Sequence, residues 1–140
     1  MTAAFVADAS IGVAWALPSQ ASQSTDRLRT EVAEGRPFVV PGLWMLEVAN
    51  TFLVLTRRGK LDGAQRVRAC RGLRLLHPIL DDQAPLVAFE QISDLAIAQA
   101  LSVYDATYLE LSLRLGLPLA TRDEALKKAA RRCGAQSLIA

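Results

Sequence analysis

The chain has 140 residues, a length that fits one domain and allows a sizeable apolar core. Apolar residues make up 51% of the chain and charged residues 21%, a balance that excludes an intrinsically disordered protein. The formal net charge is only +2, and no apolar run reaches the roughly 18 residues of a membrane span. We therefore predict a single cytoplasmic domain over residues 1–140, with no membrane segment.

Short apolar runs alternate with helical patterns along the chain. Runs bounded by turn residues predict strands at 4–7, 37–41 and 117–121, an edge strand at 78–82 and a terminal strand at 135–140. Periodic or apolar segments predict helices at 11–17, 22–35, 43–59, 62–77, 84–101, 103–116 and 123–134. Ser10 occupies the expected N-cap of the first helix, and Pro18 ends that helix. Buried strands joined by helices predict an α/β fold, with a mostly parallel sheet covered on both faces.

Four acidic residues fall where they could meet at one end of this sheet. Asp8 follows the first strand, and Asp123 lies two residues beyond Thr121 at the exit of strand 117–121. Glu47 comes one turn into the helix after the second strand, and Asp105 opens another helix, where the helix dipole tolerates negative charge. Ligands of open parallel sheets collect outside the carboxyl ends of the strands. We therefore expect the four carboxylates to converge there.

Taken singly, two of these acids have simpler explanations. Asp105 fits an ordinary acid in a first helical turn, and Asp123 fits an N-cap. Glu47 is harder to explain in this way because its helix has little polar face, and Asp8 lies between two apolar runs. Carboxylates that converge repel one another unless cations join them.

The type of cation follows from the residues that accompany the acids. The sequence has one histidine and two cysteines, without the spacing of a zinc site, so the donors are all oxygen. Oxygen donors suit Mg²⁺, with Mn²⁺ as the alternative. Such a site is typical of phosphodiester hydrolysis, in which the cations activate water and stabilise the leaving oxygen.

Basic residues are clustered although the net charge is small. Seven of the sixteen Lys and Arg residues lie within 57–74 and five within 122–132. These clusters indicate either a positive surface that faces a polyanion or solvated helix faces. Trp15 and Trp44 are candidates for stacking on nucleotide bases, but their apolar neighbours favour a place in the core or in a partner-binding groove.

Four stretches together resemble a known family. They are "DAS" near the start, an acid after "PGLW", "YDATYLELS", and "LATRD". In this combination and order the chain resembles the PIN-domain nucleases, most closely the VapC-type toxins of VapBC toxin–antitoxin modules. The resemblance implies a single PIN domain folded as a three-layer α/β/α sandwich around a mostly parallel sheet. It also implies a metal-dependent endoribonuclease that cleaves single-stranded or structured RNA, forms a homodimer and is inhibited by a VapB-type antitoxin.

The resemblance also implies roles for individual residues. The catalytic and metal-binding acids would be Asp8, Glu47, Asp105 and Asp123, and Ser10 and Thr121 would orient them through their hydroxyls. The candidates for contact with the RNA backbone are Arg57, Arg58, Arg122, Lys127 and Lys128.

Rival classes lack their motifs. Haloacid-dehalogenase hydrolases need a second Asp where Ser10 stands, response receivers need adjacent acids, and nucleotide-binding folds need a glycine-rich loop after the first strand. The remaining alternative is a catalytically idle protein of the same fold that acts by binding its antitoxin or another protein partner.

Overall fold

Four short parallel strands form the centre of the molecule. The computed structural model describes residues 3–139, and its sheet has the order β3-β2-β1-β4. The strands are β1 (Phe5–Ala7), β2 (Phe38–Pro41), β3 (Ile79–Asp81) and β4 (Leu119–Ala120). In β1, Val6 pairs with Val39 on one side and with Leu119 on the other. Strands β1, β2 and β4 are buried, which is why their sequences are continuously apolar.

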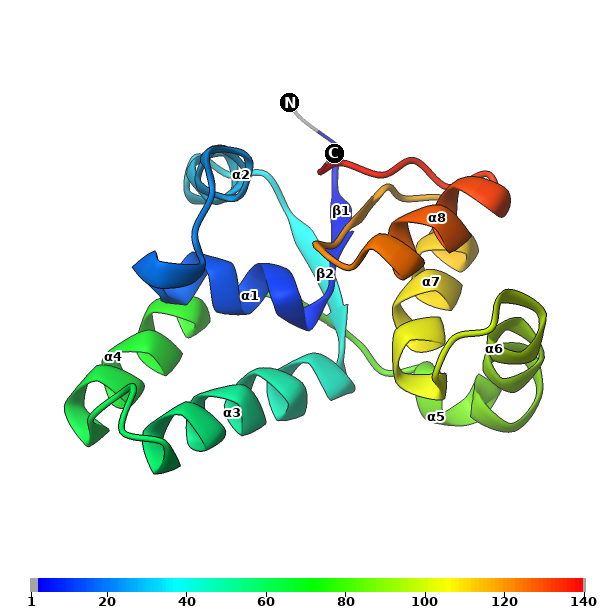
Figure 1. The fold of residues 1–140 in the computed structure, drawn as a ribbon. Helices are drawn as coiled ribbons and strands as arrows, with labels where there is room; N and C mark the ends of the chain where they lie inside the picture. The colour runs from blue at the N-terminus through cyan, green and yellow to red at the C-terminus, as the bar shows by residue number, and fades with distance from the viewer. Residues whose placement is uncertain (1–2, 140) are drawn as a thin grey trace.

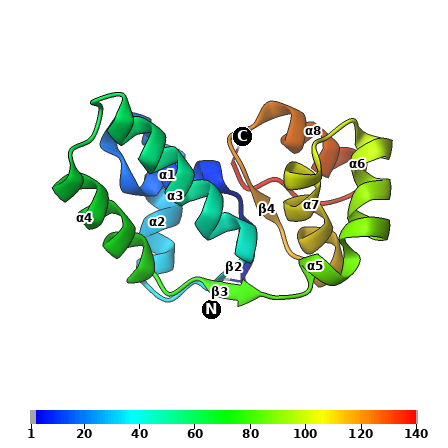
Figure 2. The same cartoon turned by 90° about the horizontal axis from the view of Figure 1, so that it is seen from below.

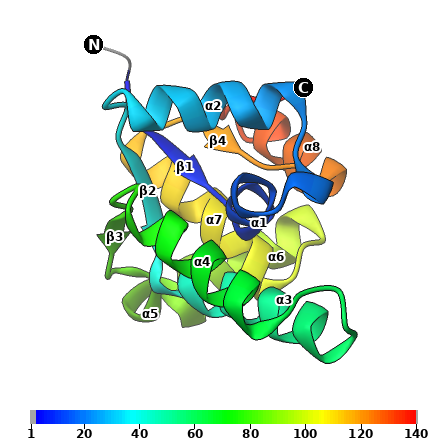
Figure 3. The ribbon, with the colours of Figure 1, turned by 90° about the vertical axis from the view of Figure 1, so that its left-hand side faces the viewer.

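Helices cover both faces of the sheet (Figure 1). The first face carries α1 (Ala9–Ala16), α2 (Gln23–Ala33), α3 (Gly42–Arg57) and α4 (Gly63–Arg74). The second face carries α5 (Ala84–Val87), α6 (Ser93–Gln99), α7 (Val103–Leu115) and α8 (Glu124–Arg132). In Figure 3, α1, α3 and α4 lie in front of the sheet, and Figure 2 shows β3 at its edge beside β2. The α/β fold with a parallel central sheet is thus confirmed.

No single helix among residues 3–139 is both long enough and apolar enough to cross a membrane. The helical stretch Ala84–Gln99 and helix α7 meet that criterion only when they are taken together, across a bend of 106°.

An aromatic cluster fills the space between the sheet and the first helical layer. Phe5, Trp15 and Phe38 pack with ring centroids 5.1–6.3 Å apart, and Trp44 adds an edge contact to Phe38 at 5.9 Å. Both tryptophans are buried, which agrees with the predicted place in the core or in a partner-binding groove. Gly12 lets α1 approach α3 closely, because a Cβ at this position would lie 2.7 Å from the Trp44 ring.

Three details of the predicted secondary structure are wrong. Asp8, not Ser10, caps α1: its carboxylate accepts the Ile11 N–H, and Ser10 lies inside the helix. A π-helical turn, Ala88–Ile92, interrupts the predicted helix 84–101, and there the Ser93 hydroxyl donates to the Ala88 carbonyl five residues back. The predicted terminal strand 135–140 is reduced to one bridge between Leu119 and Ser137, since β4 offers only two residues to pair with, and residue 140 lies outside the described range.

Candidate active site

The strand order places a crevice beside β1. Strands β2 and β3 lie on one side of β1 and β4 lies on the other, so the direction of the strand order switches between β1 and β4. Binding sites of open α/β sheets lie at such a switch point, outside the carboxyl ends of the strands. Asp8 is the first residue after β1, and Asp123 is the third residue after β4. The topology therefore brings these two acids to opposite sides of one crevice.

Asp8 is a buried carboxylate held by neutral donors. Its side chain is 5% exposed, and Oδ1 accepts the Ser10 hydroxyl at 2.6 Å and the Ile11 N–H at 3.2 Å. Oδ2 accepts the Thr121 hydroxyl. Burial raises the pKa of Asp8 to about 6, although these hydrogen bonds lower it. The charged form is thus poorly stabilised by the protein alone.

The two hydroxyls next to Asp8 also tie together the two turns that border the crevice. Thr121 Oγ1 accepts the backbone N–H of Asp123 at 3.0 Å, and Ser10 Oγ accepts the backbone N–H of Arg122 at 3.0 Å. Asp123 in turn caps α8 by accepting the Leu126 N–H at 2.8 Å. The orientation of Asp8 is therefore coupled to the turn that carries Asp123.

Glu47 has a hydrogen-bond partner that was not predicted from the sequence. The hydroxyl of Tyr108, on α7, donates to Glu47 Oε1 at 2.5 Å, and Tyr108 is 1% exposed. Burial raises the pKa of Glu47, with a further contribution from the charge of Asp105. Tyr108 lies three residues after Asp105, so helical periodicity puts the two on neighbouring positions of α7. That spacing was the available signal, but a tyrosine within an apolar helix is equally typical of core packing.

Asp105 couples the four acids electrostatically. It lies in the first turn of α7, where its backbone N–H donates to the Ser102 hydroxyl at 3.0 Å. Burial raises the pKa of Asp105, and the charge of Asp123 raises it further. The charge of Asp105 in turn raises the pKa of both Asp8 and Glu47. Within residues 3–139, none of these four acids forms an ion pair with Lys, Arg or His.

An open pocket of about 580 Å³ lies over this region. Glu47 and Asp123 line it together with Ser10, Arg122 and Asn50. Acids from α3 and from the turn before α8 therefore face one solvent-filled space, large enough for part of a polar substrate.

Comparison with known proteins identifies the family. The family model of the PIN domain matches residues 5–132. The chain belongs to the PIN-domain family. PIN domains are generally nucleases. Among solved structures, the chain is similar to PAE2754 from Pyrobaculum aerophilum, with a TM-score of 0.73 and 22% identity over 98% of this chain and 92% of that one. No curated protein matches the sequence.

PIN domains generally use divalent metal ions, and the carboxylate oxygens of the four candidate acids are suitable ligands for such an ion. All four candidate ligands are carboxylates, without His or Cys, and in the described part of the chain no cationic side chain forms an ion pair with them. Within residues 3–139, however, no three His, Cys, Asp or Glu side chains are arranged so that they could hold a metal ion. Mg²⁺ is usually bound by only one or two carboxylates plus waters and substrate phosphates, so the residues fit it without a closed cluster.

The candidates for RNA contact differ in exposure. Arg57, Arg58, Arg122 and Lys128 are exposed, and the Arg122 guanidinium donates to the Gln20 carbonyl. Lys127 is different: it is 4% exposed and its Nζ pairs with Glu124 at 3.2 Å. The prediction of an RNA contact at Lys127 does not agree with this burial, because α8 turns that side chain into the protein.

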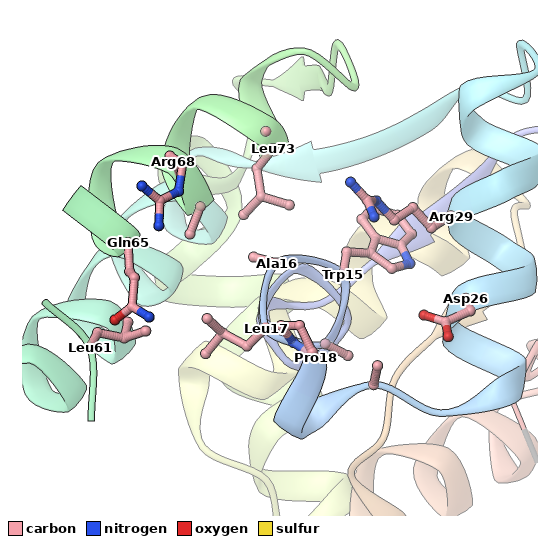
Figure 4. Close-up of a pocket in the computed structure, with 14 residues that line it drawn as sticks. Trp15, Ala16, Leu17, Pro18, Asp26, Arg29, Leu61, Gln65, Arg68 and Leu73 are labelled. Atoms are coloured by element: carbon pink, nitrogen blue, oxygen red, sulfur yellow. The ribbon is translucent and has the colours of Figure 1, made fainter. Parts of the chain in front are cut away.

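A second pocket of this PIN domain, about 630 Å³, lies away from the acids. Figure 4 shows it around the end of α1, with Asp26 and Arg29 on α2 and Arg68 on α4. Trp15 and Leu73 contribute apolar surface. None of the four candidate acids lines it, so it is a separate surface feature.

Proposed function

We propose that this PIN domain is a metal-dependent endoribonuclease, cleaving single-stranded or structured RNA as the VapC-type toxin of a toxin–antitoxin pair. One observation carries the proposal. Buried or half-buried carboxylates are coupled through Asp105, their pKa values are raised, and within residues 3–139 no cationic side chain forms an ion pair with them. Such an arrangement costs folding free energy, which a bound divalent cation would recover.

The residues have distinct parts in this proposal. Of Asp8, Glu47, Asp105 and Asp123, one or two would bind Mg²⁺ or Mn²⁺ directly and the others through its waters, and the ion would supply the positive charge that activates water and stabilises the leaving oxygen. Ser10 and Thr121 keep the two oxygens of Asp8 in a fixed orientation. The exposed Arg122, which lines the pocket, would contact a phosphate.

Exposed cations on α3 and α8 support an RNA substrate. Arg57 and Arg58 end α3, and Lys128 lies on α8. Exposed cations bind the phosphate backbone irrespective of sequence, with an affinity that falls as salt rises.

The proposed partners are a second copy of the chain and a VapB-type antitoxin. The pocket between α1, α2 and α4 is the candidate surface for the antitoxin, since it combines apolar walls with Arg29 and Arg68 at its sides. An apolar segment flanked by acidic residues would complement it.

The proposal is tested with Asp8→Asn and a matched control, Asp94→Asn, at an exposed position of α6. The wild type and the control should cleave a labelled single-stranded RNA with Mg²⁺ or Mn²⁺ and not with EDTA, and their melting temperatures should rise with Mn²⁺. Asp8→Asn should lose both responses while remaining folded. Cleavage at the native rate by Asp8→Asn would remove Asp8 from the site.

A catalytically idle binding protein is the second candidate. It is favoured by the absence, within residues 3–139, of a ready-formed group of three metal ligands. A wild-type protein that binds a partner but neither cleaves RNA nor gains stability from Mn²⁺ would establish it instead.

A further inference from the structure

Helix α7 contributes more than Asp105 to the acidic site. One turn further along, Tyr108 donates its hydroxyl to Glu47 Oε1 at 2.5 Å and so connects α7 to α3 across the site. Within residues 3–139 this is the one hydrogen bond that the Glu47 carboxylate makes. Among the same residues, none forms a hydrogen bond with the second oxygen, Oε2.

Glu47 needs such a tether because its surroundings do not otherwise hold it. It is only half-buried, its long side chain loses rotamer freedom when it is ordered, and the charge of Asp105 repels it. The backbone of α3 is anchored one turn earlier, where Trp44 Nε1 donates to the Asp8 carbonyl at 3.0 Å. That anchor places the helix but leaves the glutamate side chain free to rotate.

The phenol of Tyr108 can hold a carboxylate by a hydrogen bond without adding positive charge, which a basic residue cannot do. A Lys or Arg at position 108 would add a positive charge and compete with a cation for Glu47. The hydroxyl of Tyr108 donates one hydrogen bond and leaves the negative charge in place.

We propose that Tyr108 is a positioning residue, which holds Oε1 of Glu47 so that Oε2 is presented to a divalent cation shared with Asp105. The proposal rests on the proposed function and names a residue through which that site is organised. Ser10 and Thr121 hold Asp8 in the same manner, with neutral hydroxyl donors.

The chain supplies a matched control, since it has only two tyrosines. Tyr108→Phe removes the donor and keeps the ring, whereas Tyr104→Phe makes the same change at an exposed position. Each variant is titrated with Mn²⁺ by calorimetry and by thermal melting, without RNA. Tyr108→Phe should bind Mn²⁺ about 10-fold more weakly, the range expected for a group that orients a ligand, and Tyr104→Phe should bind like the wild type.

A double-mutant cycle with Glu47→Gln separates positioning from a general structural effect. If Tyr108 acts through Glu47, then Tyr108→Phe should weaken Mn²⁺ binding in the wild-type background and cause no further loss in Glu47→Gln. Equal losses in both backgrounds, or unchanged binding in Tyr108→Phe, would overturn the inference. If Glu47→Gln itself leaves Mn²⁺ binding unchanged, then Glu47 is not a metal ligand. That result would contradict the proposed function at this residue and is distinguishable from a failure of the role of Tyr108.

Discussion

Two groups of carboxylates lie along α7, and their surroundings differ. Near the start of the helix, Asp105 is coupled to Asp8 and Glu47, whose partners are the hydroxyls of Ser10, Thr121 and Tyr108. Near its end, Arg114 forms a bidentate pair with Asp81 of β3 at 2.9 and 3.0 Å and bonds to Glu110 at 2.8 Å. The pKa of Asp81 is lowered, first by its hydrogen bonds to Arg114, whereas burial raises the pKa values in the first group.

This difference distinguishes carboxylates with a structural role, which pair with an arginine, from carboxylates with a proposed functional role, which do not. Arg114 forms ion pairs with both of its acids and joins the edge strand β3 to α7, so these carboxylates have a cationic partner within the chain. The acids of the first group are anchored by donors that carry no charge. Their negative charge therefore remains available to a ligand, at a cost to the stability of the unliganded fold.

The largest expected effect is on catalysis. Asp105→Asn should lower RNA cleavage by at least about 100-fold, because several kcal/mol of charge stabilisation depend on this site. Asp81→Asn, the same change in the neutralised group, should leave kcat/KM within a few-fold of the wild type. Cleavage assays with Mg²⁺ measure both, and equal losses in the two variants would remove the distinction between the groups.

The next effect is on stability and follows the pKa of Asp8. The pKa of Asp8 is about 6 in the folded protein and has its ordinary value of 3.8 in the unfolded chain. Between these two pH values the folded protein binds a proton that the unfolded chain does not, so the free energy of unfolding falls as pH rises from 3.8 to about 6. Asp8→Asn has no titrating group at this position, so its free energy of unfolding does not fall in this way. Its stability relative to the wild type should grow by about 3 kcal/mol from about pH 3.5 to about pH 8, in urea unfolding with EDTA. A difference that stays constant with pH would contradict a buried, ionised Asp8.

Arg114→Gln should show the opposite dependence on pH. Removing the guanidinium leaves Asp81 and Glu110 without a cation and should cost about 1–3 kcal/mol at pH 7. The lowered pKa of Asp81 means that its contribution exists above the ordinary value near 4 and is lost as pH falls. The deficit in urea unfolding should therefore shrink at low pH, and a deficit that grows there would contradict the ion-pair role.

The smallest effect is expected at cations remote from the acids. Arg57 ends α3 ten residues after Glu47, roughly 15 Å along the helix axis. Replacing Arg57 and Arg58 by Gln should weaken RNA binding a few-fold at low salt and reduce its salt dependence, with Mn²⁺ affinity unchanged. Fluorescence anisotropy with labelled RNA measures the change in RNA affinity, and calorimetry measures the affinity for Mn²⁺. Weaker Mn²⁺ binding in this variant would contradict the distance between these arginines and the acids.

Much of the fold was predictable because local signals agreed with the tertiary structure. The buried strands are continuously apolar, and the stop signals Pro18, Gly35 and Gly116 each lie within two residues of the end of a helix. Two of the three errors fall where a side chain bonds to a backbone group. Asp8 displaced Ser10 as the cap of α1, and Ser93 bonds across the π turn.

Within the candidate site, the positions of the acids at element ends were readable from the sequence, but their partners were not. Tyr108 and Glu47 are 61 residues apart, and Thr121 and Asp8 are 113 apart. No local pattern encodes such a pairing, since it depends on how the sheet brings α3 and α7 to the same edge and on the pairing of β4 beside β1. Lys127 illustrates the same limit, because only the docking of α8 decides that it is buried while Lys128 is exposed.

The sequence by itself determined the alternation of strands and helices and the residues that end each strand, because hydrophobic periodicity and capping are local properties. Only the tertiary structure decided which acids lie close enough to raise one another's pKa and which form an ion pair with an arginine. A carboxylate's charge state depends on burial and on neighbours brought in by strand order and helix packing, and these are properties of the folded chain.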